Sequence, residues 1–507
     1  MVADTRSKIG VFFAALVLAL GGIIYELIIG TVSSYLLSDS VLQFSLTIGF
    51  MLFGMGIGSL ISPKYTQRPE SSFILNECLI ALIGANAPVL FFWVFNRGLN
   101  LYPLFFLVVV VIGIFIGLEI PLMFSLLRAK EDGAKLLSRI LSLDYLGSLI
   151  ASILFPLVLL PRLGLIRTAY LVGLLNAGAA LFMYLSFYQT LRRPKLIGAL
   201  LLGSILILSS GAAYGNRLGQ TLEQGMYRDQ IILSKQSPYQ KIVLTKFKED
   251  IRLFLNTNLQ FSSVDEHRYH EPLVHIPMAA ARTPKRVLLL GGGDGLAVRE
   301  LLKYTQLEEI TVVDLDSVMT DLGKTHPLLL SVNQGSLNQP RVTIQNEDAF
   351  RFLRETTSTY DVILADLPDP NDEGLAKLYS REFYELIKRR LSADGAFLTQ
   401  ATSPYFSNQS FWLIQRTIAA AGFETVPIHT HVPAFGEWGM VLGTHRSISP
   451  TNLNIVVLTR YLSHTVLPTL FIFDSDLIAK EQRTDVSTIL QPSILTTYTA
   501  EANSWRN

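Results

Sequence analysis

Long apolar runs dominate the first part of the chain, and short polar links containing Pro, Arg, Lys or Asn separate them. Most of the runs reach the roughly 18–20 residues that a helix needs to cross the hydrocarbon core of a bilayer. The pattern predicts a transmembrane domain of residues 1–213 with about seven helices, or six if the Pro88-containing run or the last run does not cross. The runs are 9–30, 41–62, 73–95, 104–127, 143–161, 165–187 and 196–213.

From about Met226 onwards the apolar positions form short β-rich runs. A polar turn, Lys248-Glu249-Asp250, separates two of them, and strands joined in this way pair as hairpins. The pattern predicts a small antiparallel β domain in residues 214–280, which ends in a polar stretch leading into a helix. The predicted strands are 231–233, 241–244 and 251–255.

Strand and helix patterns then alternate through residues 281–446. This alternation predicts a parallel, doubly wound α/β sheet. In such sheets ligands bind at the carboxyl ends of the strands. The tail, residues 447–507, carries one short apolar patch, Leu467–Phe473, expected to pack on the sheet or the membrane. The predicted strands are 286–290, 310–313, 342–344, 362–365, 397–400 and 440–442, and the predicted helices 296–304, 383–391 and 412–421.

Composition supports the division into a membrane part and a soluble part. Of 507 residues, 50% are hydrophobic and only 16% are charged, against roughly 25% charged in soluble domains. Up to Ala213 the chain holds 14 basic and 9 acidic residues, and the remainder is acidic by 4 charges. The net charge of +1 excludes the strong basic field of a nucleic-acid binder. The single cysteine, Cys78, cannot form an internal disulfide.

The basic residues of the membrane part concentrate in alternate loops. The positive-inside rule therefore places the amino terminus in the cytoplasm; seven crossings would then put the soluble part outside and six would put it inside. Within the runs, Glu26, Glu119 and Asp144 are candidate functional carboxylates, and the alternative for Glu119 and Asp144 is that they lie near helix ends and reach interfacial water. The loop cations are Arg6, Lys8, Lys64, Arg68, Arg128, Lys130, Lys135, Arg139, Arg192, Arg193 and Lys195.

An acidic residue follows each of the first four strands of the doubly wound sheet. The first strand runs into the glycine-rich turn Gly291–Gly295, and Asp314 closes the second strand. A carboxylate at that place accepts both hydroxyl protons of a ribose, so the pair predicts a nucleoside-containing ligand. Asp294 within the turn would repel a pyrophosphate, whereas a cationic, sulfonium-bearing ligand suits it.

Asp366 and Asp369 follow the fourth strand, and Pro368 and Pro370 stiffen the loop that carries them. Two carboxylates in one rigid loop suit a polycationic amine, because each ammonium needs an acceptor. One of them can also take the proton that an attacking amine must lose. The alternative is a turn whose aspartates are solvated or cap the next helix.

The soluble part resembles the polyamine aminopropyltransferase, or spermidine synthase, family. The membrane part resembles the multi-pass amino-terminal domain that some bacterial members carry, through Tyr25-Glu26, Ser34–Leu37 and Gln43–Ser45. The resemblance implies a Rossmann-like, class I methyltransferase-type sheet preceded by the small β domain. Its matching stretches are Ser237–Gln240, Asn258–Phe261, Asp265–Glu271, Gly291–Gly295, Asp314–Asp316, Asp348, Asp366–Pro370, Gln400 and Ser403-Pro404.

The resemblance implies roles by position. Asp366 would accept the proton of the attacking amine, and Asp369 would bind an ammonium of the acceptor. His270 and Asp294 would bind the polyamine or aminopropyl end, and Gln240 the methylthioadenosine part. Asp314 would hold the ribose hydroxyls and Asp348 the adenine amino group. The remaining expected contacts are Tyr269 and Gln400 for substrate, and Ala349, Gly291 and Gly293 for the nucleoside.

The chain departs from the family pattern around the acceptor. Leu367 and Pro368 replace a small polar pair, and Asn371–Gly374 replaces a proline-glycine continuation. Asp348-Ala349 stands where Asp-Gly is common, and Val432–Trp438 replaces a late Tyr-Pro-Ser-Gly-type segment. These changes leave the reaction class intact and bear on which amine is accepted.

The expected activity is aminopropyl transfer from decarboxylated S-adenosylmethionine to a diamine, foremost putrescine, giving spermidine and methylthioadenosine. No bound cofactor and no metal are expected; the donor is a co-substrate. The expected partners are polyamines, the donor and a lipid bilayer, with no nucleic acid, and homo-oligomer formation is left open. The soluble part is expected in the cytoplasm, where the donor is made. The rivals are an S-adenosylmethionine-dependent methyltransferase and a membrane polyamine transporter or sensor whose soluble domain only binds.

Overall fold

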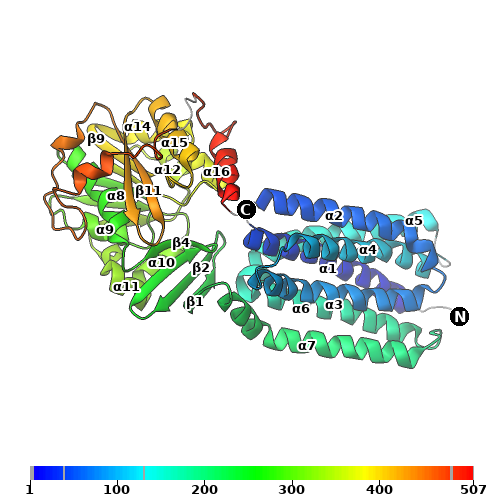
Figure 1. Cartoon of the computed structure of the whole chain (residues 1–507). Helices are drawn as coiled ribbons and strands as arrows, with labels where there is room; N and C mark the ends of the chain where they lie inside the picture. The colour runs from blue at the N-terminus through cyan, green and yellow to red at the C-terminus, as the bar shows by residue number, and fades with distance from the viewer. Residues whose placement is uncertain (1–4, 38–39, 129–131, 480–483, 506–507) are drawn as a thin grey trace. The chain divides into compact units, whose positions relative to one another are not determined.

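The computed structural model describes residues 5–37, 40–128, 132–479 and 484–505. Lys130, one of the loop cations above, lies outside the described residues. The chain divides into two units, Met1–Gln230 and Ile231–Asn507, and each is described by itself (Figure 1).

The first unit is built from long apolar helices. Six stretches are long and apolar enough to cross a membrane, judged by length and composition. One of them, Gly133–Phe187, has 55 residues, which as one helix would measure about 80 Å, far more than the ~30 Å hydrocarbon core. The helices are α1 (Thr5–Leu37), α2 (Ser40–Ile61), α3 (Pro69–Asn96), α4 (Tyr102–Leu127), α5 (Gly133–Leu154), α6 (Leu160–Phe187) and α7 (Pro194–Gln224).

The 55-residue stretch is bent rather than straight. A π-helical turn, η2 (Phe155–Leu159), joins α5 to α6, and Gly164 breaks the helical path with φ 72° and ψ 173°. A positive φ of this size is readily adopted by glycine because it has no Cβ. Both α5 and α6 pack against α1, so the break separates two neighbouring helices.

Two glycines of α2 set its distance from α4. A Cβ added to Gly54 would stand 2.5 Å from the Val110 carbonyl oxygen, and one added to Gly58 would stand 2.1 Å from that of Ile114. Such small-residue contacts are how membrane helices approach closely.

Carboxylates of the first unit occupy different environments. Glu26 and Asp144 are half-buried, whereas Glu119 is only 6% exposed and its Oε1 has no hydrogen-bond partner among the described residues. Glu77 of α3, which the sequence pattern did not single out, is fully buried. It accepts hydrogen bonds from the side-chain amides of Asn76 at 3.4 Å and Asn176 at 3.3 Å.

The second unit begins with a four-stranded sheet in the order β1-β2-β3-β4. Pairing of β2 with β3 and of β3 with β4 is antiparallel, which agrees with the predicted small β domain. Apolar side chains of this sheet pack with Leu296, Met319 and Leu329 of the following α/β part. The strands are β1 (Gln230–Gln236), β2 (Lys241–Phe247), β3 (Asp250–Leu255) and β4 (Asn258–Ser262).

A seven-stranded sheet follows, in the order β10-β11-β9-β8-β5-β6-β7. Five strands are parallel, as predicted, but β11 pairs antiparallel with both β9 and β10. The prediction of a wholly parallel sheet is therefore wrong at this edge, where the β10–β11 hairpin returns without a crossover helix. The strands are β5 (Arg286–Gly291), β6 (Glu309–Val313), β7 (Val342–Gln345), β8 (Tyr360–Asp366), β9 (Leu391–Gln400), β10 (Glu424–Val432) and β11 (Gly436–Thr444).

Helices cover both faces of this sheet, because its strands are apolar on both sides. In β5, Val287 and Leu289 belong to one buried cluster, and Leu288 and Leu290 belong to the other. The first cluster includes α8 and α9, and the second includes α12, α14 and α15. The bounds are α8 (His267–Ala280), α9 (Leu296–Leu301), α10 (Ser317–Thr325), α11 (Pro327–Asn333), α12 (Ala349–Glu355), α13 (Glu373–Ala376), α14 (Arg381–Arg390), α15 (Asn408–Ala420) and α16 (Ser493–Ser504).

The carboxyl-terminal tail packs on both faces of the sheet. Leu467 and Leu470 of the short helix η6 (Leu467–Phe471) are buried against the first cluster, which confirms the expectation that this patch packs on the sheet. Ile494 of α16 is buried in the second cluster. The tail is thus part of the folded α/β unit.

Candidate active site

The turn after β5 can be built only with glycine at its tightest points. Gly291 and Gly292 have φ values of 83° and 69°, a region that side chains with a Cβ rarely adopt. A Cβ on Gly291 would also lie 2.0 Å from the Asp366 carbonyl oxygen. The turn therefore lies directly against the end of β8. The strand order reverses between β5 and β8, which is where open α/β sheets bind ligands.

Asp314, at the end of β6, points its carboxylate at this turn. Its Oδ2 accepts the Gly293 N–H at 3.0 Å and its Oδ1 accepts the Asp316 N–H at 2.8 Å. A Cβ on Gly293 would stand only 2.5 Å from Asp314 Oδ2. Burial raises the pKa of Asp314 to about 6, against the lowering effect of these two hydrogen bonds. Asp314 is half-buried.

Asp294 occupies the turn itself and accepts the Leu296 N–H at 2.8 Å. Desolvation raises the pKa of Asp294; the neighbouring His270 lowers it, and the charge of Asp366 raises it further. Three predicted site residues from α8, the β5 turn and β8 are therefore near enough to one another to interact electrostatically.

Asp366 ends β8 and accepts a hydrogen bond from the Tyr269 hydroxyl at 2.7 Å on its Oδ1. Its Oδ2 faces Gly292, where an added Cβ would stand 3.4 Å away. Burial and the charge of Asp366 raise the pKa of Tyr269 well above its ordinary value. Tyr269 is thus a neutral donor that fixes one oxygen of Asp366 while the other faces the glycine turn.

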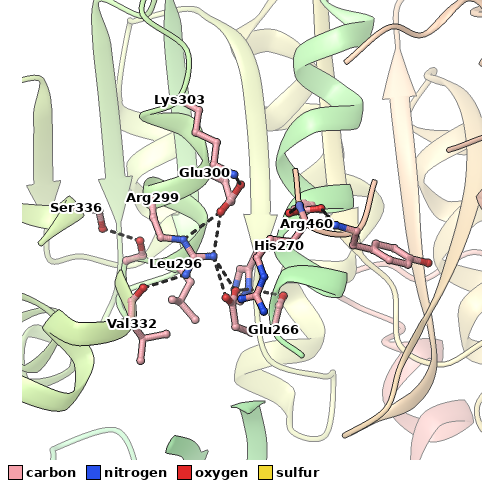
Figure 2. A network of polar contacts seen from close by, with 12 residues as sticks. Glu266, His270, Leu296, Arg299, Glu300, Lys303, Val332, Ser336 and Arg460 are labelled. Carbon is pink, nitrogen blue, oxygen red and sulfur yellow. Dashed lines mark hydrogen bonds and ion pairs between the residues drawn. The ribbon is translucent and has the colours of Figure 1, made fainter. Parts of the chain in front are cut away.

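A buried ionic network behind the site holds His270 (Figure 2). His270 Nδ1 donates to Glu266 Oε2 at 2.9 Å, and Arg299 bridges both carboxylate oxygens of Glu266 at 2.9 and 3.0 Å. Arg299 also pairs with Glu300, which in turn pairs with Lys303. Burial alone would lower the pKa of His270, but the hydrogen bond and charge of Glu266 outweigh it and raise the pKa to about 9.

The charge state of His270 bears on its expected role. An imidazolium repels an ammonium, but it attracts Asp294 and Asp366, whose charges contribute to its raised pKa. The geometry therefore favours a cation that balances the site carboxylates. The prediction that His270 contacts the aminopropyl end remains a prediction.

Asp369 lies on the loop after β8 and is contacted from two other elements. The Tyr498 hydroxyl of α16 donates to its Oδ2 at 2.8 Å, and Gln400 Nε2 of β9 lies 3.4 Å from its Oδ1. Gln400 also bonds to the Tyr379 hydroxyl and to the Leu367 carbonyl oxygen. Burial raises the pKa of Asp369 to about 6, although the Tyr498 and Gln400 hydrogen bonds lower it.

Three predicted nucleoside contacts, Asp348, Ala349 and Gln240, have their own local partners beside this arrangement. Asp348 caps α12 through the Arg351 N–H at 2.9 Å and pairs with Lys377 at 2.5 Å, and Ala349 is the buried first residue of that helix. Burial raises the pKa of Asp348, but the hydrogen bond and charge of Lys377 together with the hydrogen bonds from the Arg351 and Phe350 N–H groups lower it below its ordinary value. Gln240 donates to Asp316 Oδ2 at 2.9 Å, which ties the β1–β2 loop to the end of β6.

The structure therefore brings together one group of predicted residues and links Gln240 to it through Asp316. Glu266 lies in the matching stretch Asp265–Glu271, but its pairing with Arg299 was not predicted, because an ion pair between residues 33 positions apart has no local signature. Sequence reasoning also missed Tyr498, since nothing near that residue in the sequence resembles a site. Among the described residues, no group of three or more His, Cys, Asp or Glu side chains is arranged to hold a metal ion. The residues brought together are Tyr269, His270, Gly291, Gly293, Asp294, Asp314, Asp366, Asp369 and Gln400.

The fold and this carboxylate-lined edge define a Rossmann-like enzyme domain of the nucleoside-binding kind. Residues 266–452 match the family described as the spermine/spermidine synthase domain. A polyamine aminopropyltransferase of Leptospira interrogans is 45% identical over 86% of this chain and 88% of its own. One from Oceanobacillus iheyensis is 39% identical over 100% and 99% of the two chains. The chain therefore belongs to the polyamine aminopropyltransferase family and is an enzyme of that class.

A solved structure gives a partial likeness. A crystal structure of spermidine synthase in complex with the transition state analogue AdoDATO is 25% identical, with a TM-score of 0.46, and covers 48% of this chain and 86% of that chain.

Proposed function

We propose that this aminopropyltransferase uses decarboxylated S-adenosylmethionine as co-substrate and a diamine, foremost putrescine, as acceptor. The observation that carries the proposal is the convergence of Asp294, Asp366 and Asp369 on the ends of β5 and β8, next to Asp314. A cationic nucleoside donor and a cationic acceptor each find carboxylates there.

The reaction is a single displacement. The lone pair of the neutral acceptor nitrogen attacks the carbon beside the sulfonium, a C–N bond forms, and the C–S bond breaks with its electron pair on sulfur. Methylthioadenosine leaves as a neutral thioether. The new secondary ammonium has one proton more than the neutral product amine, and Asp366 takes it. Holding the two reactants in line supplies much of the rate.

Each residue of the site has its own role in binding or orienting the two substrates. Asp314 holds the ribose hydroxyls, with Gln240, Asp348, Ala349 and the Gly291–Gly293 turn around the rest of the nucleoside. Asp294 attracts the aminopropyl ammonium and repels the carboxylate that ordinary S-adenosylmethionine carries at that place. Asp369 binds the far ammonium of the acceptor, with Gln400 beside it. Tyr269 orients Asp366, and the His270 imidazolium limits the repulsion among the carboxylates.

The experiment uses the full chain in detergent. The protein is incubated with decarboxylated S-adenosylmethionine and a panel of diamines and polyamines, and mass spectrometry identifies the products. We expect methylthioadenosine together with spermidine from putrescine. Release of methylthioadenosine with a different amine, and not with putrescine, would show that this other amine is the acceptor. In a parallel incubation with S-adenosylmethionine, methyl transfer in the absence of any aminopropyl transfer would instead support the methyltransferase rival.

We further propose that the first unit lies in the cell membrane as a multi-pass domain and that the α/β unit works in the cytoplasm. Supporting this are the long apolar helices, which by length and composition suit a bilayer, and a donor whose charged nucleoside does not cross a bilayer unaided. Homo-oligomer formation stays a prediction.

A further inference from the structure

The helix α16 lies beyond the part of the chain that matches the family, which ends at residue 452. It nevertheless reaches the site: the half-buried Tyr498 donates its hydroxyl hydrogen to Asp369 Oδ2 at 2.8 Å. Asp369 lies 129 positions earlier in the chain. A residue of the tail thus contacts the carboxylate proposed to bind the acceptor.

The position of α16 is fixed by contacts on two sides. Glu501 Oε1 accepts the Gln409 N–H at 2.8 Å, and its Oε2 accepts the N–H and the hydroxyl of Ser410 at 3.0 and 2.7 Å. A carboxylate at these first amides of α15 also faces the positive end of that 13-residue helix. Ile494 is fully buried in the core, so Tyr498 is carried on an anchored element.

The two oxygens of Asp369 have different environments. Oδ2 accepts the Tyr498 hydroxyl hydrogen, whereas the contact of Oδ1 found among the described residues is the long one of 3.4 Å from Gln400. The titratable groups around Asp369 are the hydroxyls of Tyr269, Tyr379 and Tyr498, and no cationic side chain contacts it within the described ranges. The pair of contacts fixes the plane of the carboxylate and leaves Oδ1 able to accept a cation.

We propose that Tyr498 is a positioning residue that orients Asp369 toward the ammonium of the acceptor amine, so that the carboxyl-terminal helix completes the acceptor subsite. The inference rests on the proposed function, because it takes Asp369 as the acceptor-binding carboxylate. The late Tyr-Pro-Ser-Gly-type segment of the family is replaced here by Val432–Trp438, and α16 supplies a tyrosine from another element.

Two consequences separate this role from a structural one. When a charged group loses a hydrogen bond, binding of a ligand through that group weakens by roughly 10-fold to 100-fold. The loss should appear in the KM of the acceptor and leave the KM of the donor unchanged. The Tyr498 hydrogen bond also lowers the pKa of Asp369, so its removal should move the acid limb of the acceptor kcat/KM profile to higher pH.

The test compares Tyr498→Phe with Tyr405→Phe in the full chain. Tyr405 is an exposed tyrosine whose ring packs on Trp505. Tyr405→Phe is the matched control, because it also removes one tyrosine hydroxyl. Putrescine binding is measured by calorimetry with methylthioadenosine present, and turnover is measured with both substrates varied. We expect Tyr498→Phe to weaken diamine binding and raise acceptor KM roughly 10-fold or more, with methylthioadenosine affinity and thermal midpoint unchanged and Tyr405→Phe like wild type.

A second variant, Glu501→Gln, keeps Tyr498 but weakens the attachment of α16 to α15, and it should raise acceptor KM in the same direction. Unchanged diamine binding and an unchanged pH profile in Tyr498→Phe would overturn the proposal, as would an equal rise in donor and acceptor KM. If the wild type binds the diamine but shows no turnover, the proposed function is wrong. The Tyr498 proposal is then still tested by comparing the diamine affinities of the wild type and Tyr498→Phe. A wild type that binds no diamine would overturn both.

Discussion

The carboxyl group of Asp366 combines one fixed oxygen with one that faces the glycine turn. Asp366→Asn keeps the shape of the side chain but cannot accept the proton of the attacking amine. We expect kcat to fall by about 10²–10⁴-fold, while methylthioadenosine still binds. Methylthioadenosine release and calorimetry measure the two quantities, with the exposed Asp321→Asn as matched control. A variant with near-normal kcat would remove Asp366 from its role.

Asp314 makes a different kind of contact, because ribose hydroxyls are held equally before and during the reaction. Asp314→Ala should therefore weaken donor binding while kcat at saturating donor is largely retained. Since burial raises the pKa of Asp314 to about 6, donor affinity of the wild type should fall as pH drops below about 6, and the variant should lack this fall. Calorimetry with methylthioadenosine across pH measures both effects. Equal affinity in the two proteins would contradict the assignment.

The site residues that the strand pattern alone indicated follow strand ends or lie in the glycine-rich turn, whereas Gln240, Tyr269, His270 and the role of Asp348 were expected only through the family resemblance. Asp314, Asp366 and Asp369 could be found because the carboxyl ends of parallel strands meet at one edge of a sheet. The pairing of Glu266 with Arg299 and the contact of Tyr498 could not, since each depends on how distant helices pack. No local pattern marks Tyr498, although its hydroxyl contacts a residue that the sequence did identify.

At the scale of elements, α8 and α9 are joined by the Glu266–Arg299 ion pair beneath the site. The pKa of His270 is raised from 6.5 to about 9 in the folded chain, so the protonated form favours the folded state. This contribution, roughly 3 kcal/mol, is fully present below about pH 6.5 and is lost as pH rises through about 9.

The thermal midpoint of the wild type should therefore fall more steeply between pH 6.5 and pH 9.5 than that of His270→Asn. Scanning calorimetry of both proteins in detergent measures the difference, and substitution of the exposed His464 by Asn provides the control, which should follow the wild type. Parallel curves for wild type and His270→Asn would show that Glu266 does not hold an imidazolium.

Most elements followed from periodicity, and the exceptions have physical reasons. The continuous apolar run within residues 286–290 predicted a buried strand, and in the structure β5 is buried on both faces. The strand β10 was missed because its sequence ETVPIHTHV is polar and half-buried along much of its length. It pairs only with β11 at the edge of the sheet, where few apolar residues are required. Helix α16 was missed for a similar reason: only Ile494 is buried.

At the scale of the whole molecule, the long helices and the α/β unit occur together in relatives: the Oceanobacillus iheyensis protein aligns with 100% of this chain. Two arguments give opposite answers for the side of the membrane on which the α/β unit lies. The turn η2 lies between α5 and α6, and the break at Gly164 lies near the start of α6. The described part of the first unit thus has seven long helices, and seven crossings with these loop cations would leave the α/β unit outside. The donor is a charged nucleoside, however, and an external enzyme would require its export.

We predict that the α/β unit faces the cytoplasm, because the rule of loop charge is a bias, whereas the absence of donor would abolish the reaction altogether. A topology in which one stretch, α3 or α7, does not cross the membrane reconciles the two arguments. Reporter fusions after Ala213 and after Asn507 decide the side, and a fusion in the Arg162–Arg167 segment decides whether α5 and α6 both cross. A reporter active only outside the cytoplasm at both of the first two positions would contradict the prediction. The donor would then have to pass the membrane, and the buried carboxylates Glu77 and Glu119 would become the first residues to substitute in a transport assay.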